Sequence, residues 1–135
     1  MAGDWGTSKV KGQTLLIRAI EPADAEAVGN FLRRHGRGSA ENPLGFLGKL
    51  VGDLVAVLTI EMSERNIEVR DLIVREDLRR KRIGRLMLGE LERIAPSTGL
   101  QSLRAQPSQD ARPFFQKAGF LEEGPFMVRR VSRAE

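Results

Sequence analysis

The 135-residue chain contains no cysteine and no tyrosine, and only one tryptophan and one histidine. Without cysteine it can form no disulfide and offers no thiolate to a metal ion, and cysteine usage does not indicate its compartment. No apolar run approaches the roughly 18 residues of a membrane span, and residues 1–13 (MAGDWGTSKVKGQ) lack the apolar core of a signal peptide. We therefore expect a cytoplasmic protein that contacts no membrane.

Hydrophobic residues make up 41% of the chain and charged residues 30%, which is typical of one soluble globular domain with its own core. The formal net charge of +4 favours an anionic partner. The positive charge is concentrated, because six of the eleven residues from 75 to 85 are basic. These six residues are Arg75, Arg79, Arg80, Lys81, Arg82 and Arg85.

Hydrophobic spacing predicts a chain in which strands and helices alternate. The predicted strands are residues 14–20, 44–51, 54–62, 66–74, 100–106 and 125–131, and the predicted helices are residues 21–34, 82–95 and 108–120. Residues 1–12 are expected to be a flexible leader ahead of a single domain of residues 13–135. The order predicts an α/β (α+β) fold with a mixed, mostly antiparallel central sheet of about six to seven strands flanked by helices.

Residues 78–88 (LRRKRIGRLML) place five basic residues and one glycine where the helix 82–95 is predicted to begin. The first N–H groups of a helix lack intrahelical partners and carry the positive end of its dipole, so cations there cost energy unless an anion offsets them. Gly84 removes a Cβ where a phosphate must approach the backbone. Neither a Walker loop nor the dinucleotide-binding glycine pattern occurs in the chain. A solvated basic surface, a nucleic-acid patch and a phosphate site stay open, and the dipole favours an anionic ligand.

Two segments together resemble the GNAT superfamily of acyl-CoA-dependent N-acyltransferases. The family signature Q/R-x-x-G-x-G/A, which follows a strand and opens a helix, is matched by Arg79, Ile83 and Gly84, with Arg82 at the first glycine position. Residues 111–120 (ARPFFQKAGF) resemble the family segment A-x-x-x-(F/Y)-x-x-x-G-F. The predicted order of elements also agrees, and the resemblance covers about residues 15–131.

The resemblance implies that an acyl-CoA, which we expect to be acetyl-CoA, binds in a cleft where two central parallel strands splay apart. The pantetheine arm would pair with the backbone of the strand that ends at residue 74, as an added strand does. The pyrophosphate would rest on the first N–H groups of the next helix. The cofactor-binding residues implied in this way are Leu72, Ile73, Val74, Arg79, Arg80, Lys81, Arg82, Ile83, Gly84, Arg85 and Phe115.

The chain departs from the family pattern at three positions. Arg82 replaces the first signature glycine, so that its Cβ narrows the turn. Ser108 stands where the family often has a CoA-contacting asparagine. Phe115 stands where a tyrosine often follows Phe114, and a phenyl ring has no proton to donate. The leaving thiolate must therefore take its proton from water, from Ser108 as a weak candidate acid, or from the substrate.

Acylation of an amine requires that a base remove the amine proton. Glu68 occupies the strand position where family members with a direct carboxylate base carry glutamate, and Glu61 and Asp71 are neighbouring alternatives. An equally good interpretation makes Glu68 a solvent-facing residue paired with an arginine. His35, at the C-terminal end of the first helix, is expected to be a structural cap because a cation suits that end of the dipole.

The sequence therefore predicts an N-acetyltransferase that moves an acetyl group from acetyl-CoA to a primary amine of a small molecule or peptide by direct attack, without a metal. The substitutions at Phe115 and Arg82 favour an alternative, a non-catalytic CoA-binding or regulatory domain. A nucleic-acid module that uses the basic turn is less favoured, because aromatics are 5% of the chain and none interrupts the basic run. A homodimer stays open.

Overall fold

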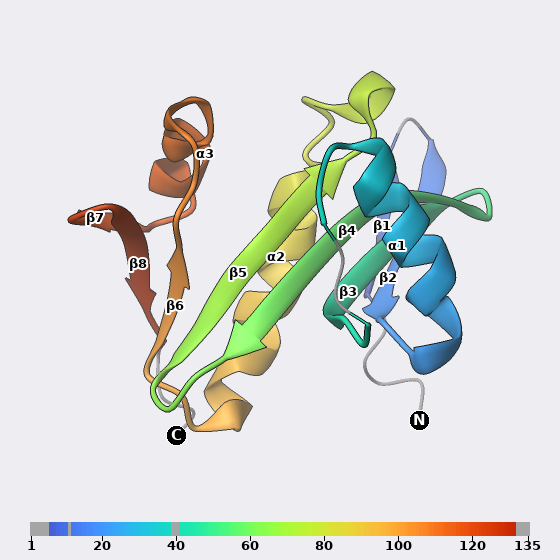
Figure 1. The fold of residues 1–135 in the computed structure, drawn as a ribbon. Coiled ribbons are helices and arrows are strands. Elements are labelled where there is room, and N and C mark those ends of the chain that lie inside the picture. The colour runs from blue at the N-terminus through green and yellow to red at the C-terminus, as the bar shows by residue number, and fades with distance from the viewer. Residues whose placement is uncertain (1–5, 11, 39–40, 132–135) are drawn as a thin grey trace.

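The computed structural model describes residues 6–10, 12–38 and 41–131, and these residues form one sheet of eight strands with three α-helices (Figure 1). The strands are β1 (Gly6–Val10), β2 (Gln13–Ala19), β3 (Leu44–Leu50), β4 (Asp53–Met62), β5 (Asn66–Val74), β6 (Ser102–Ala105), β7 (Leu121–Glu123) and β8 (Phe126–Arg130). The helices are α1 (Ala25–Arg34), α2 (Ile83–Ile94) and α3 (Arg112–Lys117). Short 3-10 helices are Pro22–Asp24, Glu76–Leu78, Ala95–Thr98 and Gln109–Ala111. Among the described residues, no helix is long and apolar enough to cross a membrane.

The sheet order is β1-β2-β3-β4-β5-β6-β8-β7, and every neighbouring pair is antiparallel except β5 and β6. This confirms the predicted mixed, mostly antiparallel sheet flanked by helices. The sheet has eight strands instead of six to seven, because β1 and β7 lie at its two edges and were not predicted.

The prediction of a flexible leader was wrong for residues 6–10, which form β1 and pair with β2. Three consecutive polar residues of β1, at positions 7–9, gave no apolar alternation to recognise. Only Val10 of β1 is buried among the side chains that the structure describes. All three residues of β7 are exposed, so its sequence also lacks the alternation of buried apolar and exposed polar residues that identifies a strand. Residues 1–5 and 11 of the predicted leader lie outside the described residues.

The helices cover the two faces of the sheet unequally (Figure 1). On one face, Ile83, Met87 and Leu91 of α2 pack in the larger core cluster. On the other face, Phe31 and Leu32 of α1 pack in a smaller cluster with strands β3 and β4. These apolar positions recur at helical spacing, and so the sequence places each helix against the sheet.

The parallel pair β5–β6 ends early, and this opens the sheet. Pairing runs from Asn66 opposite Ser102 to Val69 opposite Ala105, whereas β5 continues to Val74 paired with β4 and unpaired on the side of β6. Against β4, the register shifts by one residue, so that Arg70 forms a β-bulge that bends the strand. Figure 1 shows β5 and β6 diverging beyond this point. We call the end of the pairing, at Val69 and Ala105, the fork; it confirms the predicted splay between two parallel strands.

Candidate functional site

The turn before α2 holds two arginines in the left-handed region of backbone space. Arg82, the N-cap of α2, has φ 69° and ψ 9°, and Arg80 has φ 66°. The family signature has a glycine at the position of Arg82, and glycine takes this conformation without the cost that a Cβ brings, of order 1–2 kcal/mol. The chain thus keeps the backbone shape that the signature predicts, with a strained arginine in place of the glycine.

The start of α2 is uncapped. No described side chain donates to or accepts from its cap position, and its first turn contains no acidic residue. The first bond of the helix runs from the Leu86 N–H to the Arg82 carbonyl oxygen at 3.0 Å, so the N–H groups of the three preceding residues point outward. An anion placed there would meet both the free donors and the positive end of the dipole.

A cleft of about 770 Å³ lies between the start of α2, α3 and the unpaired end of β5. We call it the α2 cleft; it is lined by Leu72, Val74, Leu78, Arg79, Arg80, Arg82, Ile83, Gly84, Arg85, Ala111, Pro113, Phe114, Phe115 and Lys117. A Cβ on Gly84 would lie 3.5 Å from the Phe114 ring, an ordinary contact. Alanine would therefore fit at this position, as the G/A of the signature requires.

The backbone of β5 beyond the fork offers hydrogen-bonding groups to the α2 cleft. The Arg75 N–H donates to the Val55 carbonyl oxygen on β4 at 2.8 Å. In a strand, the backbone N–H and C=O groups of successive residues point alternately toward the two neighbouring strands. Those of Leu72 and Val74 therefore point away from β4, to the side where β6 no longer pairs with β5. The Val74 carbonyl oxygen accepts from Arg79 Nε at 3.2 Å. Ile73 does not line the cleft; its side chain packs against the smaller core cluster on the α1 face of the sheet.

The charges at the mouth of the α2 cleft have few partners. No ion pair is found among the described residues for Arg80, Lys81 or Arg82. Arg85 is paired with Glu92 at 3.3 Å, and Glu92 also accepts from Arg129 at 2.6 Å. Of the predicted basic contacts, Lys81 is exposed and is not part of the lining. The mouth therefore carries positive charge that the protein itself does not neutralise.

The structure separates Phe115, at the family's usual tyrosine position, from Ser108, the weak candidate acid. Phe115 is buried, lines the α2 cleft and packs edge-on against Phe114 and Phe120, with ring centroids 5.2 and 5.1 Å apart. It is therefore an apolar part of the lining of the α2 cleft. Ser108 is exposed and is absent from the lining of the cleft. The structure does not bring Ser108 to the site.

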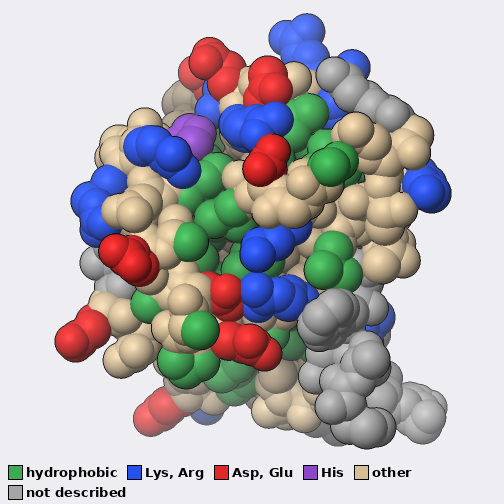
Figure 2. Space-filling view, turned by 90° about the vertical axis from the view of Figure 1, so that its right-hand side faces the viewer, with side chains coloured by type: hydrophobic (Ala, Val, Ile, Leu, Met, Phe, Trp, Pro, Cys, Tyr) green, Lys and Arg blue, Asp and Glu red, His purple; other side chains and the backbone are tan. Residues whose placement is uncertain are grey.

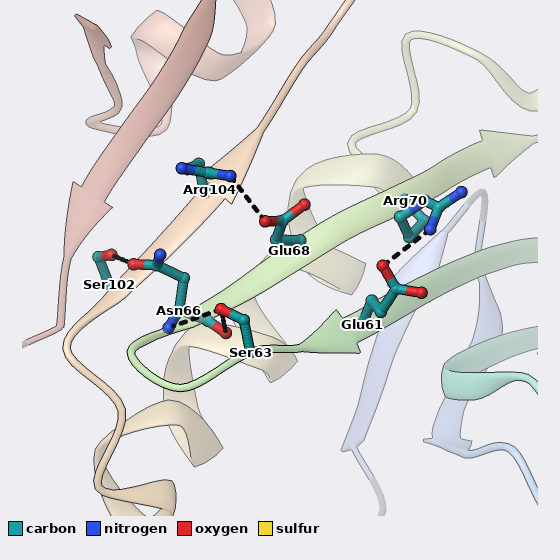
Figure 3. A network of polar contacts seen from close by, with 7 residues as sticks. All are labelled: Glu61, Ser63, Asn66, Glu68, Arg70, Ser102 and Arg104. Carbon is teal, nitrogen blue, oxygen red and sulfur yellow. Dashed lines mark hydrogen bonds and ion pairs between the residues drawn. The ribbon is translucent and has the colours of Figure 1, made fainter.

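The candidate base Glu68 lies on the opposite face of the sheet, one residue before the fork. Its Oε2 accepts from Arg104 Nη2 at 2.8 Å (Figure 3), and the two residues are opposite one another in the β5–β6 register. The Arg104 guanidinium lies 4.0 Å from the centroid of the Phe126 ring. No described residue hydrogen-bonds to Glu68 Oε1, which leaves one carboxylate oxygen available as a proton acceptor.

The two alternative bases are also paired with arginines. Glu61 accepts from Arg70 at 2.9 Å (Figure 3), and Asp71 accepts from Arg37 Nε at 2.7 Å and from the Thr59 hydroxyl at 2.6 Å. Because of the bulge, Arg70 and Asp71 follow one another yet both lie on this face of the sheet. Charges of both signs are also interspersed on the side of the molecule that carries α1 (Figure 2).

Three arginines near Glu68 were not predicted, namely Arg37, Arg70 and Arg104. The alternative interpretation of Glu68 predicted an arginine partner without identifying which arginine. Arg104 becomes that partner through the register of two strands 36 positions apart, which no local pattern reveals. His35 was predicted correctly as a cap: it closes α1, with Nδ1 2.8 Å from the Phe31 carbonyl oxygen.

A sheet forked between two parallel strands, with an uncapped basic helix start beside the fork, defines the acyl-CoA-dependent N-acyltransferase class. A model of the acetyltransferase (GNAT) family matches residues 14–120, and the chain belongs to this family. The match covers both motifs, at residues 79–84 and 111–120.

Solved structures with the same fold have low sequence identity to the chain. The ribosomal-protein-S18-alanine N-acetyltransferase from Escherichia coli has a TM-score of 0.74 at 18% identity, over 90% of this chain and 96% of that chain. A GNAT acetyltransferase from Streptococcus pneumoniae has a TM-score of 0.75 at 22% identity, over 87% and 99%. The PaiA N-acetyltransferase from Thermoplasma acidophilum, solved in complex with coenzyme A, has a TM-score of 0.69 at 17% identity, over 86% and 98%. These likenesses establish the fold.

Proposed function

We propose that the protein transfers the acetyl group of acetyl-CoA to a primary amine of a small molecule or peptide by direct attack. The observation that carries this proposal is the fork. The α2 cleft lies beside the unpaired end of β5 on one face of the sheet, and Glu68 precedes the fork on the other face. A thioester in the cleft and an amine beside Glu68 would then meet at the fork, where no strand separates them. Location in the cytoplasm stays a prediction from the sequence.

The residues of the α2 cleft fit an acyl-CoA. The backbone groups of Leu72 and Val74 would pair with the pantetheine amides, and Phe115 would form an apolar wall beside the arm. The outward N–H groups at the start of α2 would hold the pyrophosphate. Arg79, Arg80 and Arg82 would add charge-assisted hydrogen bonds to the phosphates. Acetyl-CoA supplies the activated acyl group.

The chemistry needs an acceptor for the amine proton and donors for the oxyanion. Glu68 Oε1 would accept the proton, directly or through water. A backbone N–H at the end of β5 would stabilise the oxyanion of the tetrahedral intermediate, which requires no particular side chain. With Phe115 in the cleft and Ser108 outside it, the leaving thiolate would take its proton from water.

A non-catalytic CoA-binding domain is the second candidate. Two observations favour it. Phe115 stands at the family's usual tyrosine position, so this position supplies no side-chain acid to the cleft, and Glu68 is paired with Arg104 instead of being free. Both candidates require CoA binding, so only turnover distinguishes them.

Binding and turnover test the proposal separately. Calorimetry should show that CoA and acetyl-CoA bind, and thiol release with a panel of amines should then show acyl transfer. Binding without transfer to any amine would favour the second candidate. If a short oligonucleotide binds at low salt and CoA does not, both readings fail, because the basic turn then serves nucleic acid.

The role of Glu68 is tested by Glu68→Gln. We expect kcat to fall about 10²- to 10⁴-fold and the pH–rate profile to flatten, with unchanged CoA affinity. Glu64→Gln is the control, because Glu64 is an exposed carboxylate in the β4–β5 hairpin that lines none of the cavities at the fork. Unchanged kcat in Glu68→Gln would remove Glu68 from the mechanism. Glu61→Gln and Asp71→Asn would then test the two neighbouring carboxylates.

A further inference from the structure

We propose that the acceptor amine carries a carboxylate, and that Arg70 binds this carboxylate. The inference rests on the proposed function and names the substrate class of the same site. It is argued from the cavities, charges and ion pairs on the face of the sheet that carries Glu68.

Two cavities adjoin on this face. A small one of about 190 Å³ lies at the fork and is lined by Glu68, Arg104 and the fork residues themselves. A larger one of about 770 Å³ extends toward the C-terminal end of α1 and the loop that follows it. Arg37 and Arg70 line both cavities, so the two lie next to each other. We call them together the acceptor groove.

The charge at the fork is unfavourable for a simple amine. The small cavity is lined by three arginines, Arg37, Arg70 and Arg104, and by one carboxylate, that of Glu68. Each arginine has a carboxylate partner, but those of Arg70 and Arg37 line only the larger cavity, so the small cavity faces the positive ends of these two pairs. A carboxylate on the substrate would pair with an arginine there while the amine lies at Glu68 Oε1.

Arg70 is the arginine best able to bind that carboxylate, because the other two are already committed. Arg104 holds Glu68 and lies over the Phe126 ring. Arg37 makes two contacts with β5, to the Asp71 carboxylate at 2.7 Å and to the Arg70 carbonyl oxygen at 3.1 Å, and so ties its loop to the bulge.

The existing partner of Arg70 is easily exchanged. The only described hydrogen bond of its side chain goes to Glu61, and the two side chains are 58% and 64% exposed. Exposed ion pairs of this kind contribute little to stability. A substrate carboxylate can thus replace Glu61, which stays in solvent. Because Arg70 is the bulge residue next to the fork, the exchange occurs beside Glu68.

Matched substrates test the inference. Each amino acid in a series of increasing chain length is compared with its primary amide and with the amine that lacks the carboxyl group. We expect kcat/KM for the free acid to exceed that for the amide by about tenfold or more, because a charged hydrogen bond is lost with the carboxylate. Equal or better use of the amides would overturn the inference.

A variant assigns the effect to Arg70. In Arg70→Gln, the ratio of kcat/KM for acid over amide should fall toward one. Arg130→Gln is the matched control, since Arg130 is exposed and lines none of the three cavities described here, and it should keep the wild-type ratio. A ratio that falls equally in both variants would overturn the assignment to Arg70. If Arg70→Gln fails to fold, the ratio of kcat/KM for acid over amide in the wild-type protein still tests whether the substrate carboxylate is recognised.

Product binding gives a readout that does not depend on turnover. With CoA present, an N-acetyl amino acid should raise the melting temperature more than its primary amide does, and the difference should vanish in Arg70→Gln. If no amine of any kind is acetylated, the proposed function fails, and this binding difference alone decides the inference: its presence supports the carboxylate site and its absence overturns it.

Discussion

Helices α1 and α2 both begin with N–H groups that have no partner inside the helix, but only α1 supplies negative charge from its own sequence. Before α1, Asp24 Oδ2 accepts from the Glu21 N–H at 2.7 Å, and Asp24 is paired with Arg18 at 2.7 Å. This pairing lowers the pKa of Asp24 from 3.8 to about 2. At α2 the N-cap position is occupied by Arg82, a cation in a strained conformation, and neither N-cap side chain bonds to an N–H group of its own helix.

One chain thus uses the start of a helix in two ways. Before α1, Asp24 closes a 3-10 turn by accepting from the Glu21 N–H and places a carboxylate at the positive end of the helix, which serves stability. The start of α2 has no such carboxylate, and arginines beside it form no ion pair with the described residues. A bound anion would therefore stabilise the start of this helix. Variants that make one helix start more like the other should therefore affect stability and CoA binding differently.

The largest effect is expected when α2 is given the negative charge that α1 has. In Arg82→Asp, a carboxylate replaces a cation in the lining of the α2 cleft and repels the phosphates of CoA. Calorimetry should show CoA affinity weakened by about ten- to a hundredfold. Lys81→Asp carries the same change of charge outside the lining and should weaken binding less. Equal losses would mean that CoA responds only to the overall charge of the turn.

A smaller effect is expected when α1 loses its own negative charge. Asp24→Ala should lower the free energy of unfolding by about 1–2 kcal/mol, since the 3-10 turn before α1 loses its hydrogen bond to the Glu21 N–H and Arg18 loses its partner. Urea unfolding measures this loss, and CoA affinity should stay the same. Glu26→Ala, in the exposed first turn of α1, should cost at most about 1 kcal/mol. A larger loss in Glu26→Ala than in Asp24→Ala would contradict the role assigned to Asp24 in the turn before α1.

The pH dependence of stability should carry the same signature. Because the pKa of Asp24 is lowered on folding from 3.8 to about 2, its contribution is complete above about pH 4 and is lost as the pH falls toward 2. The difference in unfolding free energy between the wild type and Asp24→Asn should therefore shrink over this window. Urea unfolding at several pH values measures it, and a constant difference down to pH 2 would contradict the lowered pKa.

The smallest effect is expected from relieving the strain at α2. Arg82→Gly restores the signature glycine and should raise the free energy of unfolding by about 0.5–1 kcal/mol, since the relieved left-handed strain exceeds the entropy cost of glycine. Arg79→Gly is the matched control, because Arg79 has an extended backbone with φ −66°. It should destabilise the protein. The same sign of change in both variants would show that the strain at Arg82 is not what limits stability.

Much of the cofactor side was predictable because its signals are local. The basic turn, Gly84 and the start of α2 at residue 83, predicted at 82, all lie within one short segment. The acceptor side was less predictable. Glu68 was identified as a candidate base from its place in the strand, but its ion pair with Arg104 depends on which residues of β5 and β6 stand opposite one another.

The sequence by itself determined the family, the alternation of strands and helices and the positive charge at the start of α2, because periodicity and contiguous motifs encode them. Only the tertiary structure decided where β5 leaves β6, that Arg70 forms the bulge and that three arginines surround the fork. The physical reason is that strand register and bulges follow from packing between segments far apart in the chain, and a shift of one residue would move every such side chain to the other face.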